Sequence, residues 1–222
     1  MLPFEGAHLG RERCGEGSFA RHRHAFGYIC VVLSGGFKEA GESGRFCVSA
    51  GDAILHQPFE AHLDVFARSG ADILNLPLPE DVAAEGRVRI ADPDSIARLA
   101  EQDVGAAARA AAASLPCDAA DEDWPDMLAS ALRSCRPFSL GTWASQHRLA
   151  AATVTRGFRK AYGITPARYR AEIRARRAWQ AVHASADPLA AIAGDGGFAD
   201  QAHMTRAVRQ VTGQPPGRWR TA

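Results

Sequence analysis

The stretch AATVTRGFRKAYGITPARYR, residues 151–170, recurs 50 positions later as QAHMTRAVRQVTGQPPGRWR, residues 201–220. Each copy places basic residues at helical spacing, then a glycine, a proline and an aromatic residue followed by arginine. Two copies are too few for a solenoid, because stacked-repeat folds need about three repeats or more. The duplication predicts two similar helical units that read one polymer, and the alternative is a duplication that serves packing alone. The matching residues are Ala152, Thr155, Arg156, Arg159, Gly163, Pro166, Arg168 and Arg170, and then Ala202, Thr205, Arg206, Arg209, Gly213, Pro216, Arg218 and Arg220.

The formal net charge of +1 hides a strong asymmetry along the chain. Residues 1–137 hold 13 Lys and Arg against 21 Asp and Glu, a net charge of −8. Residues 138–222 hold 13 against 4, a net charge of +9. A basic part joined to an acidic part is the expected layout of a nucleic-acid-binding module with a regulatory domain. Because the acidic part repels DNA, we expect contacts with double-stranded DNA to be confined to the C-terminal part.

Three general features of the sequence indicate a cytoplasmic protein. No apolar run approaches the 18 residues or so of a membrane-spanning helix, so we expect no membrane contact. The N-terminus lacks the pattern of a signal peptide. The cysteines are odd in number and lack CxxC spacing, which fits a reducing compartment better than a disulfide framework. They are Cys14, Cys30, Cys47, Cys117 and Cys135.

Residues 18–78 show the pattern of short strands. The β-branched run 28–33 ends at a Ser-Gly-Gly turn signal over 34–36, and the apolar segments 45–48 and 53–55 flank another turn at 50–52. The segments 65–66 and 72–76 continue the series. Several short strands at this spacing predict a small β-barrel or a sandwich within residues 1–93.

The pattern changes to helical after this region. Residues 94–115 are rich in alanine with few helix breakers, and 124–132 place apolar residues three and four apart. We interpret residues 94–134 as a helical dimerisation segment of a homodimer, followed by a linker at 135–138. The alternative is that both helices cover the open side of their own barrel.

The C-terminal part, residues 139–222, reads as helices throughout. Ser139 is a suitable N-cap for a helix over 140–147, and a second helix is predicted over 151–162. The second copy repeats this with helices over 189–193 and 200–211, separated by a glycine turn. Each pair predicts a helix-turn-helix, and a long helix over 166–183 connects the two. In this connecting helix we expect Arg170, Arg174, Arg176 and Arg177 to form an exposed basic side.

The segment GFADQAHMTR, residues 197–206, followed by Gly213 and Pro216, resembles the C-terminal motif of the AraC/XylS family of transcription regulators. The resemblance covers residues 139–220, with both helix-turn-helix units and the connecting helix in order. It implies that the second helix of each unit reads one major-groove segment and that the two segments lie about one helical turn apart. It also makes RNA polymerase a further candidate partner. By position, the implied DNA-reading residues are Ala152, Thr153, Thr155 and Arg156 in the first unit and Gln201, Ala202, His203, Thr205 and Arg206 in the second.

The chemistry of these side chains agrees in part with base reading. Arg156 or Arg206 can bind guanine bidentately and Gln201 can do so with adenine. The alternative for each arginine is a phosphate contact or an intramolecular ion pair. Arg159, Lys160 and Arg209 are expected to touch phosphates, which position the protein without specifying sequence.

The first unit departs more from the family pattern than the second. Arg148 stands where a turn glycine is usual, and Ala150 stands where a capping serine is usual. Met204 and Val208 replace expected phenylalanines in the second unit. We therefore expect the second unit, with its turn glycine Gly197, to carry more of the specificity.

The N-terminal part contains His22-Arg23-His24, Gly35 eleven residues on, and later Gly51-Asp52 with His62. These residues resemble the two short motifs of the cupin barrels, and the resemblance covers residues 18–76. Alternate residues of a strand share a face, so His22 and His24 point the same way and His62 can join them from a neighbouring strand. Three imidazoles suit a divalent transition metal such as Zn, Ni, Fe or Cu, which is the candidate cofactor. The cupin glutamate, however, is absent at Tyr28.

Two further positions depart from the cupin motifs, and the role of the histidines stays open. Gln57 and Phe59 replace the usual proline and glycine of the second motif. The histidines hold a metal, form hydrogen bonds to an organic effector in an empty barrel, or are structural. His56 is an extra candidate ligand that we place on the outer face.

The sequence thus predicts an α+β chain with a small cupin-like β-barrel, a helical segment and an all-α double helix-turn-helix domain. The predicted function is sequence-specific DNA binding by a transcription regulator that responds to a small-molecule or metal effector, without catalytic residues. The alternative is a metal-dependent cupin enzyme with an appended DNA-binding domain. The absence of a fourth ligand at Tyr28 argues against this enzyme.

Overall fold

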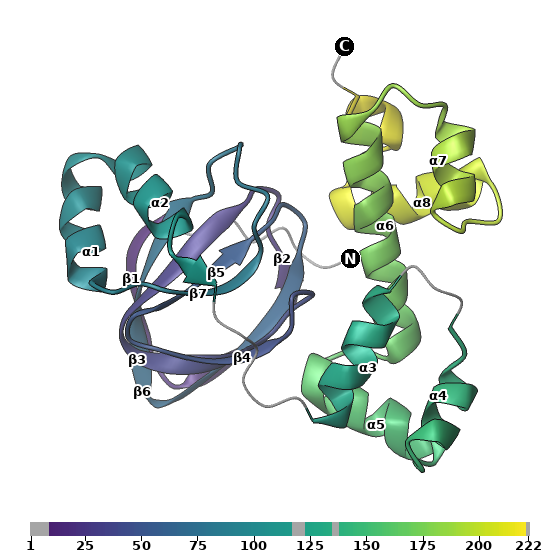
Figure 1. Ribbon diagram of the computed structural model, residues 1–222, viewed down its shortest axis with the longest axis horizontal. Coiled ribbons are helices and arrows are strands. Elements are labelled where there is room, and N and C mark those ends of the chain that lie inside the picture. The colour runs from purple at the N-terminus through teal and green to yellow at the C-terminus, as the bar shows by residue number, and fades with distance from the viewer. Residues whose placement is uncertain (1–8, 117–122, 135–137, 221–222) are drawn as a thin grey trace. The chain divides into compact units, whose positions relative to one another are not determined.

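The computed structural model describes residues 9–116, 123–134 and 138–220 (Figure 1). The chain divides into two units: residues 2–130 with 160–163 form the N-terminal unit, and residues 131–159 with 164–222 form the C-terminal unit. The N-terminal unit is rich in antiparallel strands and the C-terminal unit is helical, so the predicted α+β class is confirmed. Among the described residues, no helix is both long and apolar enough to cross a membrane.

Eight antiparallel strands form the sheet of the N-terminal unit. The two longest, β3 (Tyr28–Ala40) and β6 (Ala61–Pro77), pair along most of their lengths and form its centre. β1 and β2 pair with β6, β4 and β5 pair with β3, and β7 joins β5 to β8. The remaining strands are β1 (Gly10–Cys14), β2 (Gly17–Arg23), β4 (Arg45–Ser49), β5 (Asp52–His56), β7 (Gly86–Arg89) and β8 (Leu115–Pro116).

The sheet curves without closing, so the small β-barrel expected from the sequence is an open one. The described pairings run from β1 to β8, and no pairing joins these two ends. The turn expected over 34–36 is also absent, because β3 continues through it with an irregular register. Gly35 has a φ of 70°, and a Cβ there would lie 2.2 Å from the carbonyl oxygen of Gly70. The glycine therefore permits a close approach of β3 and β6 at a bulge instead of ending a strand.

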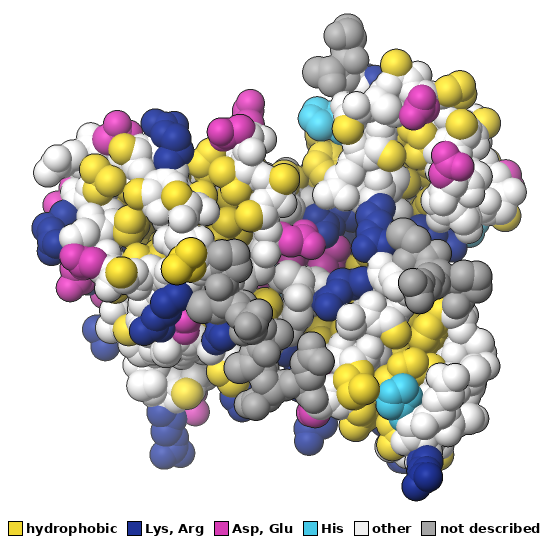
Figure 2. Space-filling model, in the orientation of Figure 1, with side chains coloured by type: hydrophobic (Ala, Val, Ile, Leu, Met, Phe, Trp, Pro, Cys, Tyr) yellow, Lys and Arg dark blue, Asp and Glu magenta, His cyan; other side chains and the backbone are white. Residues whose placement is uncertain are grey.

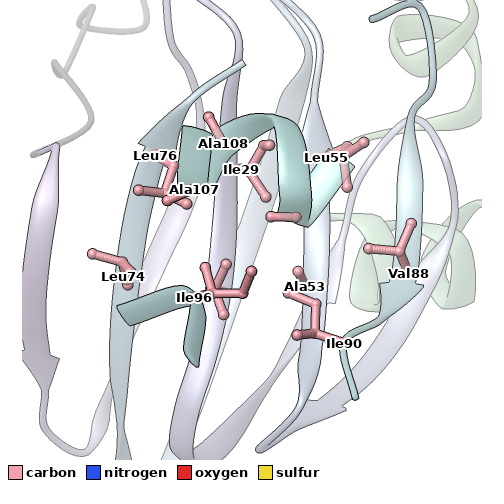
Figure 3. Packing of buried hydrophobic residues seen from close by; sticks show 12 residues of the cluster. Ile29, Ala53, Leu55, Leu74, Leu76, Val88, Ile90, Ile96, Ala107 and Ala108 are labelled. Atoms are coloured by element: carbon pink, nitrogen blue, oxygen red, sulfur yellow. The ribbon is translucent and has the colours of Figure 1, made fainter. Parts of the chain in front are cut away.

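The outer face of the sheet carries the larger apolar cluster. Helices α1 (Pro93–Gln102) and α2 (Val104–Ala112) lie across it and contribute small and branched side chains (Figure 3). The cluster joins Ile29, Val31, Ala53, Leu55, Leu74, Leu76, Val88 and Ile90 of the sheet region to Ile96, Ala107, Ala108 and Ala111 of the helices. These two helices thus cover their own sheet, so their apolar faces are already used, and dimerisation stays a prediction.

The helix expected over 94–115 is two helices, because Asp103 interrupts it. The Asp103 side chain accepts a hydrogen bond from the backbone N–H of Ala106 at 2.9 Å and so caps α2. A third helix, α3 (Trp124–Arg133), follows near its expected place.

The C-terminal unit contains the five predicted helices near their expected bounds. The helices of the first unit and the connecting helix are α4 (Leu140–Gln146), α5 (Ala151–Tyr162) and α6 (Pro166–Ala184). Those of the second unit are α7 (Leu189–Asp195) and α8 (Gln201–Thr212), and a short 3-10 helix η1 (Pro216–Arg218) follows. Ser139 caps α4 as predicted, accepting from the Thr142 N–H at 3.3 Å.

The long helix α6 forms the centre of the C-terminal unit. Its buried side chains include Tyr169 and Ile173, and the ring of Phe158 from α5 meets Tyr169 edge-on at 5.3 Å. Arg176, which we expected on an exposed basic side, is only 5% exposed. The helix packs against both α7 and α8, so more of its circumference is covered than one amphipathic stripe predicts.

Candidate nucleic-acid interface and ligand cavity

The two helix-turn-helix units make the same turn with the same backbone hydrogen bonds. In the first, the N–H of Leu149 donates to the carbonyl of Ala144 at 2.9 Å. In the second, the N–H of Phe198 donates to the carbonyl of Ala193, also at 2.9 Å. The preceding N–H, of Arg148 or Gly197, bonds three residues back in both cases. The duplication seen in the sequence is therefore a duplication of local geometry.

The units differ in how the turn passes into the second helix. The second unit has one more residue, Ala199, between the turn and its helix. Asp200 then caps α8, its carboxylate accepting from the His203 N–H at 2.6 Å. At the equivalent position before α5 stands Ala150, whose methyl group accepts no hydrogen bond.

The second helices α5 and α8 present nearly the same pattern of exposed residues. Positions four and eight of each are buried, as Val154, Phe158, Met204 and Val208. The first two positions and the sixth are exposed in both helices, which places Arg156 and Arg206 alike. Of the residues implied in DNA contact, Ala152, Thr153, Arg156, Arg159, Lys160, Gln201, Ala202, Arg206 and Arg209 are exposed, and Thr155, His203 and Thr205 are half-buried.

The half-burial of His203 reflects its packing. Its ring meets the ring of Phe198 edge-on at 5.3 Å, so part of this side chain belongs to the turn of its own unit.

Basic side chains (dark blue) of the C-terminal unit lie at the molecular surface in Figure 2.

Arg174 of α6 holds the second turn, a role that the sequence did not reveal. Its guanidinium lies 4.5 Å from the centre of the Phe198 ring and donates to the carbonyl of Gly197 at 3.1 Å. Cation–π and hydrogen-bond contacts of this kind orient the turn that precedes α8. Helical spacing alone predicted only an exposed basic side for this arginine.

The three histidines expected to converge do converge inside the N-terminal unit. His22 lies opposite His62 in the pairing of β2 with β6, and His24 follows the end of β2. One ring nitrogen from each lies within 4.8 Å of the others, and all three side chains are buried. The alternation of strand side chains is the reason that His22 and His24 face the same way.

Hydrogen bonds define the roles of particular ring nitrogens of the histidines. Nδ1 of His22 donates to the carbonyl of Ala20 at 2.9 Å. The Tyr28 hydroxyl lies 3.1 Å from Nε2 of His62, whereas Nδ1 of His62 is buried without a hydrogen-bond partner. Burial and the neighbouring His56 lower the pKa of His62 well below its usual value, so this ring is neutral.

His56 lies inside the unit, which corrects its placement on the outer face. It pairs with Tyr28 across β3 and β5, and the two rings stack at 4.4 Å. Its Nε2 lies 3.3 Å from Oε2 of Glu39. Burial by itself disfavours the imidazolium, but the Glu39 carboxylate outweighs it and raises the pKa of His56 to about 9.

These residues line a cavity of about 400 Å³ on the inner face of the sheet. Sequence reasoning missed Glu39 and Asp64 as lining residues. Inward positions on β3 are even-numbered up to Val32 and odd-numbered from Phe37 on, since the bulge shifts the alternation by one residue. Burial and the Glu39 carboxylate raise the pKa of Asp64 well above its usual value. The full lining is Glu12, Cys14, Phe19, His22, His24, Tyr28, Cys30, Phe37, Glu39, His56, Asp64, Phe66, Ile73 and Asn75.

The structure is similar to several solved structures at low sequence identity. The chain is similar to ToxT from Vibrio cholerae with bound unsaturated fatty acid, at 10% identity over 97% of this chain and 96% of that chain, with a TM-score of 0.43. It is similar over 42% of its length to a probable AraC family transcriptional regulator from Rhodopseudomonas palustris, at 19% identity over 94% of that chain and a TM-score of 0.39. The DNA-binding domain of AdpA in complex with a target DNA aligns with 44% of the chain, at 20% identity over 90% of that chain and a TM-score of 0.39.

The family comparison is specific to the helical unit. No curated protein matches the sequence. A family model described as a helix-turn-helix domain matches residues 130–222. This range contains both duplicated units and the helix between them, the same order of elements that the motifs at Gly197 and Gly213 predict. Residues 130–222 therefore belong to the helix-turn-helix domains of the AraC type, which bind DNA in transcription regulators.

Proposed function

We propose that the chain is a sequence-specific transcription regulator in which the C-terminal unit reads double-stranded DNA and the N-terminal unit binds an effector. The proposal of DNA binding rests on the matching pattern of exposed and buried positions in α5 and α8. Two helices with the same buried positions present the same outward positions, as two copies of a reading element must. The net charge of +9 over residues 138–222 supplies attraction to phosphates.

The proposed contacts divide into base reading and phosphate binding. Arg156 and Arg206 are exposed at equivalent positions and can each form two hydrogen bonds with guanine. Gln201, at the start of α8, can do the same with adenine. Arg159, Lys160 and Arg209 lie further along the helices and suit phosphate contacts, which set position without sequence preference.

Binding of the full chain to duplex DNA containing a selected site tests this proposal. If about six phosphates are neutralised, log affinity falls with log salt at a slope near −5. The double variant Arg156→Ala/Arg206→Ala should lose sequence preference. Arg68→Ala is the matched control, because that arginine side chain is 92% exposed in the N-terminal unit. A salt-insensitive affinity, or equal losses for Arg68→Ala and the double variant, contradicts the proposal.

We propose further that the cavity beside His22, His24 and His62 is the effector site. It combines a concave shape with buried polar groups, which is the usual character of a small-molecule site. Its volume of about 400 Å³ lies within the range of known ligand pockets. An effector held there by imidazole hydrogen bonds would stabilise one arrangement of the chain, and the difference in its affinity for the two arrangements sets how strongly DNA binding changes.

A divalent transition metal is a second candidate for the same site. The hydrogen bond from Nδ1 of His22 to Ala20 fits it, because ligating histidines commonly bond through their other nitrogen to a backbone carbonyl. The contact between the Tyr28 hydroxyl and Nε2 of His62 would act likewise if Nδ1 of His62 held the metal. A metal bound by three imidazoles supplies a Lewis acid with an open position for the effector.

Metal analysis of the purified full chain separates the two candidates. A stoichiometric metal that is lost in His22→Ala and in His62→Ala, but retained in His183→Ala, supports the metal site. His183 is an exposed histidine of the C-terminal unit and serves as the control. A chain that takes up no Zn, Ni, Fe or Cu leaves the organic effector as the sole candidate for the cavity.

A further inference from the structure

The cavity of the N-terminal unit has an acidic lining. Three carboxylates, Glu12, Glu39 and Asp64, line it, and none of its described lining residues is lysine or arginine. His56 forms an ion pair with Glu39 and so offsets one of these charges. Because carboxyl groups outnumber cationic side chains in this lining, the interior favours a positively charged ligand over an anion.

Two of these carboxyl groups have a buried oxygen atom without a hydrogen-bond partner. The Glu39 side chain is 1% exposed, and while Oε2 faces His56, Oε1 has no hydrogen-bond partner. Oδ1 of Asp64 is also buried without a partner. Leaving a buried acceptor unsatisfied costs more free energy than an average hydrogen bond returns, so such atoms are rare in folded proteins. Both atoms therefore point to a ligand that brings N–H donors into the cavity.

Aromatic rings form another part of the lining. Phe37 and Phe66 stack with their centres 4.7 Å apart, and Phe19 meets Phe66 edge-on at 5.8 Å. Phe19 is 47% exposed although it lines the cavity, so it lies at the opening. Aromatic faces favour both apolar groups and cations.

We propose that the cavity binds an organic cation, an amine with one apolar arm. The ammonium donates to Glu39 and Asp64, and the arm packs against Phe37 and Phe66. An ammonium carries three donors and no acceptor, which matches the two carboxyl oxygens, Oε1 of Glu39 and Oδ1 of Asp64, that have no hydrogen-bond partner. Hydrogen bonds between charged partners are about twice as strong as neutral ones. The proposal rests on the proposed effector site, since it names the chemical class of the effector for that cavity.

Calorimetric titration of the full chain with three probes of one skeleton tests the charge preference. The probes are 2-phenylethylamine, the neutral 2-phenylethanol and the anion phenylacetate. We expect the amine to bind about tenfold or more tightly than the alcohol, because it alone makes charge-assisted bonds, and we expect no binding of the anion. Equal or tighter binding of the alcohol or of phenylacetate, or no binding of the amine, overturns the proposal.

Two variants locate the bound amine. Glu39→Gln keeps the size of the side chain and removes its charge, so the amine should bind about tenfold more weakly while the affinity for 2-phenylethanol changes little. Asp64→Asn should act in the same direction, and it covers the case in which Glu39→Gln fails to fold. Glu16→Gln is the control, because that side chain is 66% exposed and lies outside the cavity. Unchanged amine affinity in a folded Glu39→Gln or Asp64→Asn chain also overturns the proposal.

The same samples separate this inference from the proposed function. Treatment with a chelator should leave amine binding unchanged, because Glu39 and Asp64, and no metal, hold the ammonium. DNA affinity of the full chain, measured with and without each probe, reports on regulation. If phenylacetate binds and changes DNA affinity, the effector site stands and the cationic class is wrong. If the amine binds and DNA affinity never changes, the cationic class stands and the regulatory role of the cavity is wrong.

Discussion

Arg148 and Gly197 occupy the same turn position in the two helix-turn-helix units, and both have a left-handed backbone, with φ values of 54° and 67°. Glycine adopts this conformation without a steric penalty, whereas a residue with a Cβ does so at a cost of about 1–2 kcal/mol. Arg148 is one of two described non-glycine residues with positive φ. The first unit therefore carries a local strain that the second unit lacks.

Arg148→Gly should raise the free energy of unfolding by about 0.5–1 kcal/mol, since relief of the left-handed strain exceeds the added flexibility of glycine in the unfolded chain. Urea denaturation of the full chain measures this change. Arg177→Gly, at an exposed position inside α6, should instead lower stability by about 1 kcal/mol. If both variants change the free energy of unfolding in the same direction, the result contradicts a backbone strain at Arg148.

Ala150→Asp should stabilise the first unit by about 1 kcal/mol, because it restores the N-cap that α5 lacks. Asp200→Ala is the reciprocal change and should destabilise the second unit by a similar amount, since it removes the bond to the His203 N–H. Thermal denaturation of the two variants and of the double variant provides the comparison. The idea fails if Ala150→Asp leaves the midpoint unchanged while Asp200→Ala lowers it.

Arg174→Ala should weaken specific DNA binding by disturbing the turn before α8, even though Arg174 belongs to the connecting helix. The expected effect is a loss of base preference at the half of the site that α8 reads, with the salt slope unchanged. A direct phosphate contact would instead weaken binding to all sequences and make the slope shallower by about one unit. Selected-site assays at several salt concentrations distinguish these outcomes.

The second unit should be the main reader of sequence. Gln201→Ala and Arg206→Ala should each relax preference at one operator position and cost about 1–3 kcal/mol. Arg159→Ala should weaken all sequences alike. We rank the units in this order because α8 has its cap and its turn glycine, whereas α5 has neither. The ranking is wrong if Arg156→Ala loses more base preference in a selected-site assay than Gln201→Ala and Arg206→Ala together.

A homodimer remains a prediction for the full chain. The apolar faces of α1 and α2 are used against their own sheet, so pairing has to use what these helices leave exposed, such as Val104, which is 47% exposed. Sedimentation at tens of micromolar should detect any dimer worth about −8 kcal/mol. We expect Val104→Glu to weaken it, and a wild-type monomer at that concentration counts against dimerisation.

The helices of the C-terminal unit could be predicted because their boundaries are local. Caps such as Ser139, turn glycines and the 3.6-residue period all act within a few positions of one another. The bounds of α5 follow from them directly. Arg176 was misplaced because its burial depends on how α6 packs with α7 and α8, which no local pattern records.

The lining residues of the candidate cavity could be predicted only where alternation along a single strand determines which side chains face inward. His22 lies on β2 and His24 directly follows its end, so their common face follows from the alternation of side chains along the strand. Glu39 could not be placed in the same way, because the bulge near Gly35 reverses which positions of β3 face inward. His56 likewise depends on the cross-strand register with Tyr28, a long-range relationship that composition does not contain.

In β5 and in β3 up to Val32, even-numbered and odd-numbered residues have two separate roles. Ile29, Val31, Ala53 and Leu55 hold the helices on the outer face, while Tyr28 and His56 face the cavity. Because side chains alternate along a strand, a change at one of the inward positions leaves the outer packing in place. Substitutions at the inward positions can therefore change the ligand specificity of this sheet during evolution. The residues that pack against the helices stay the same.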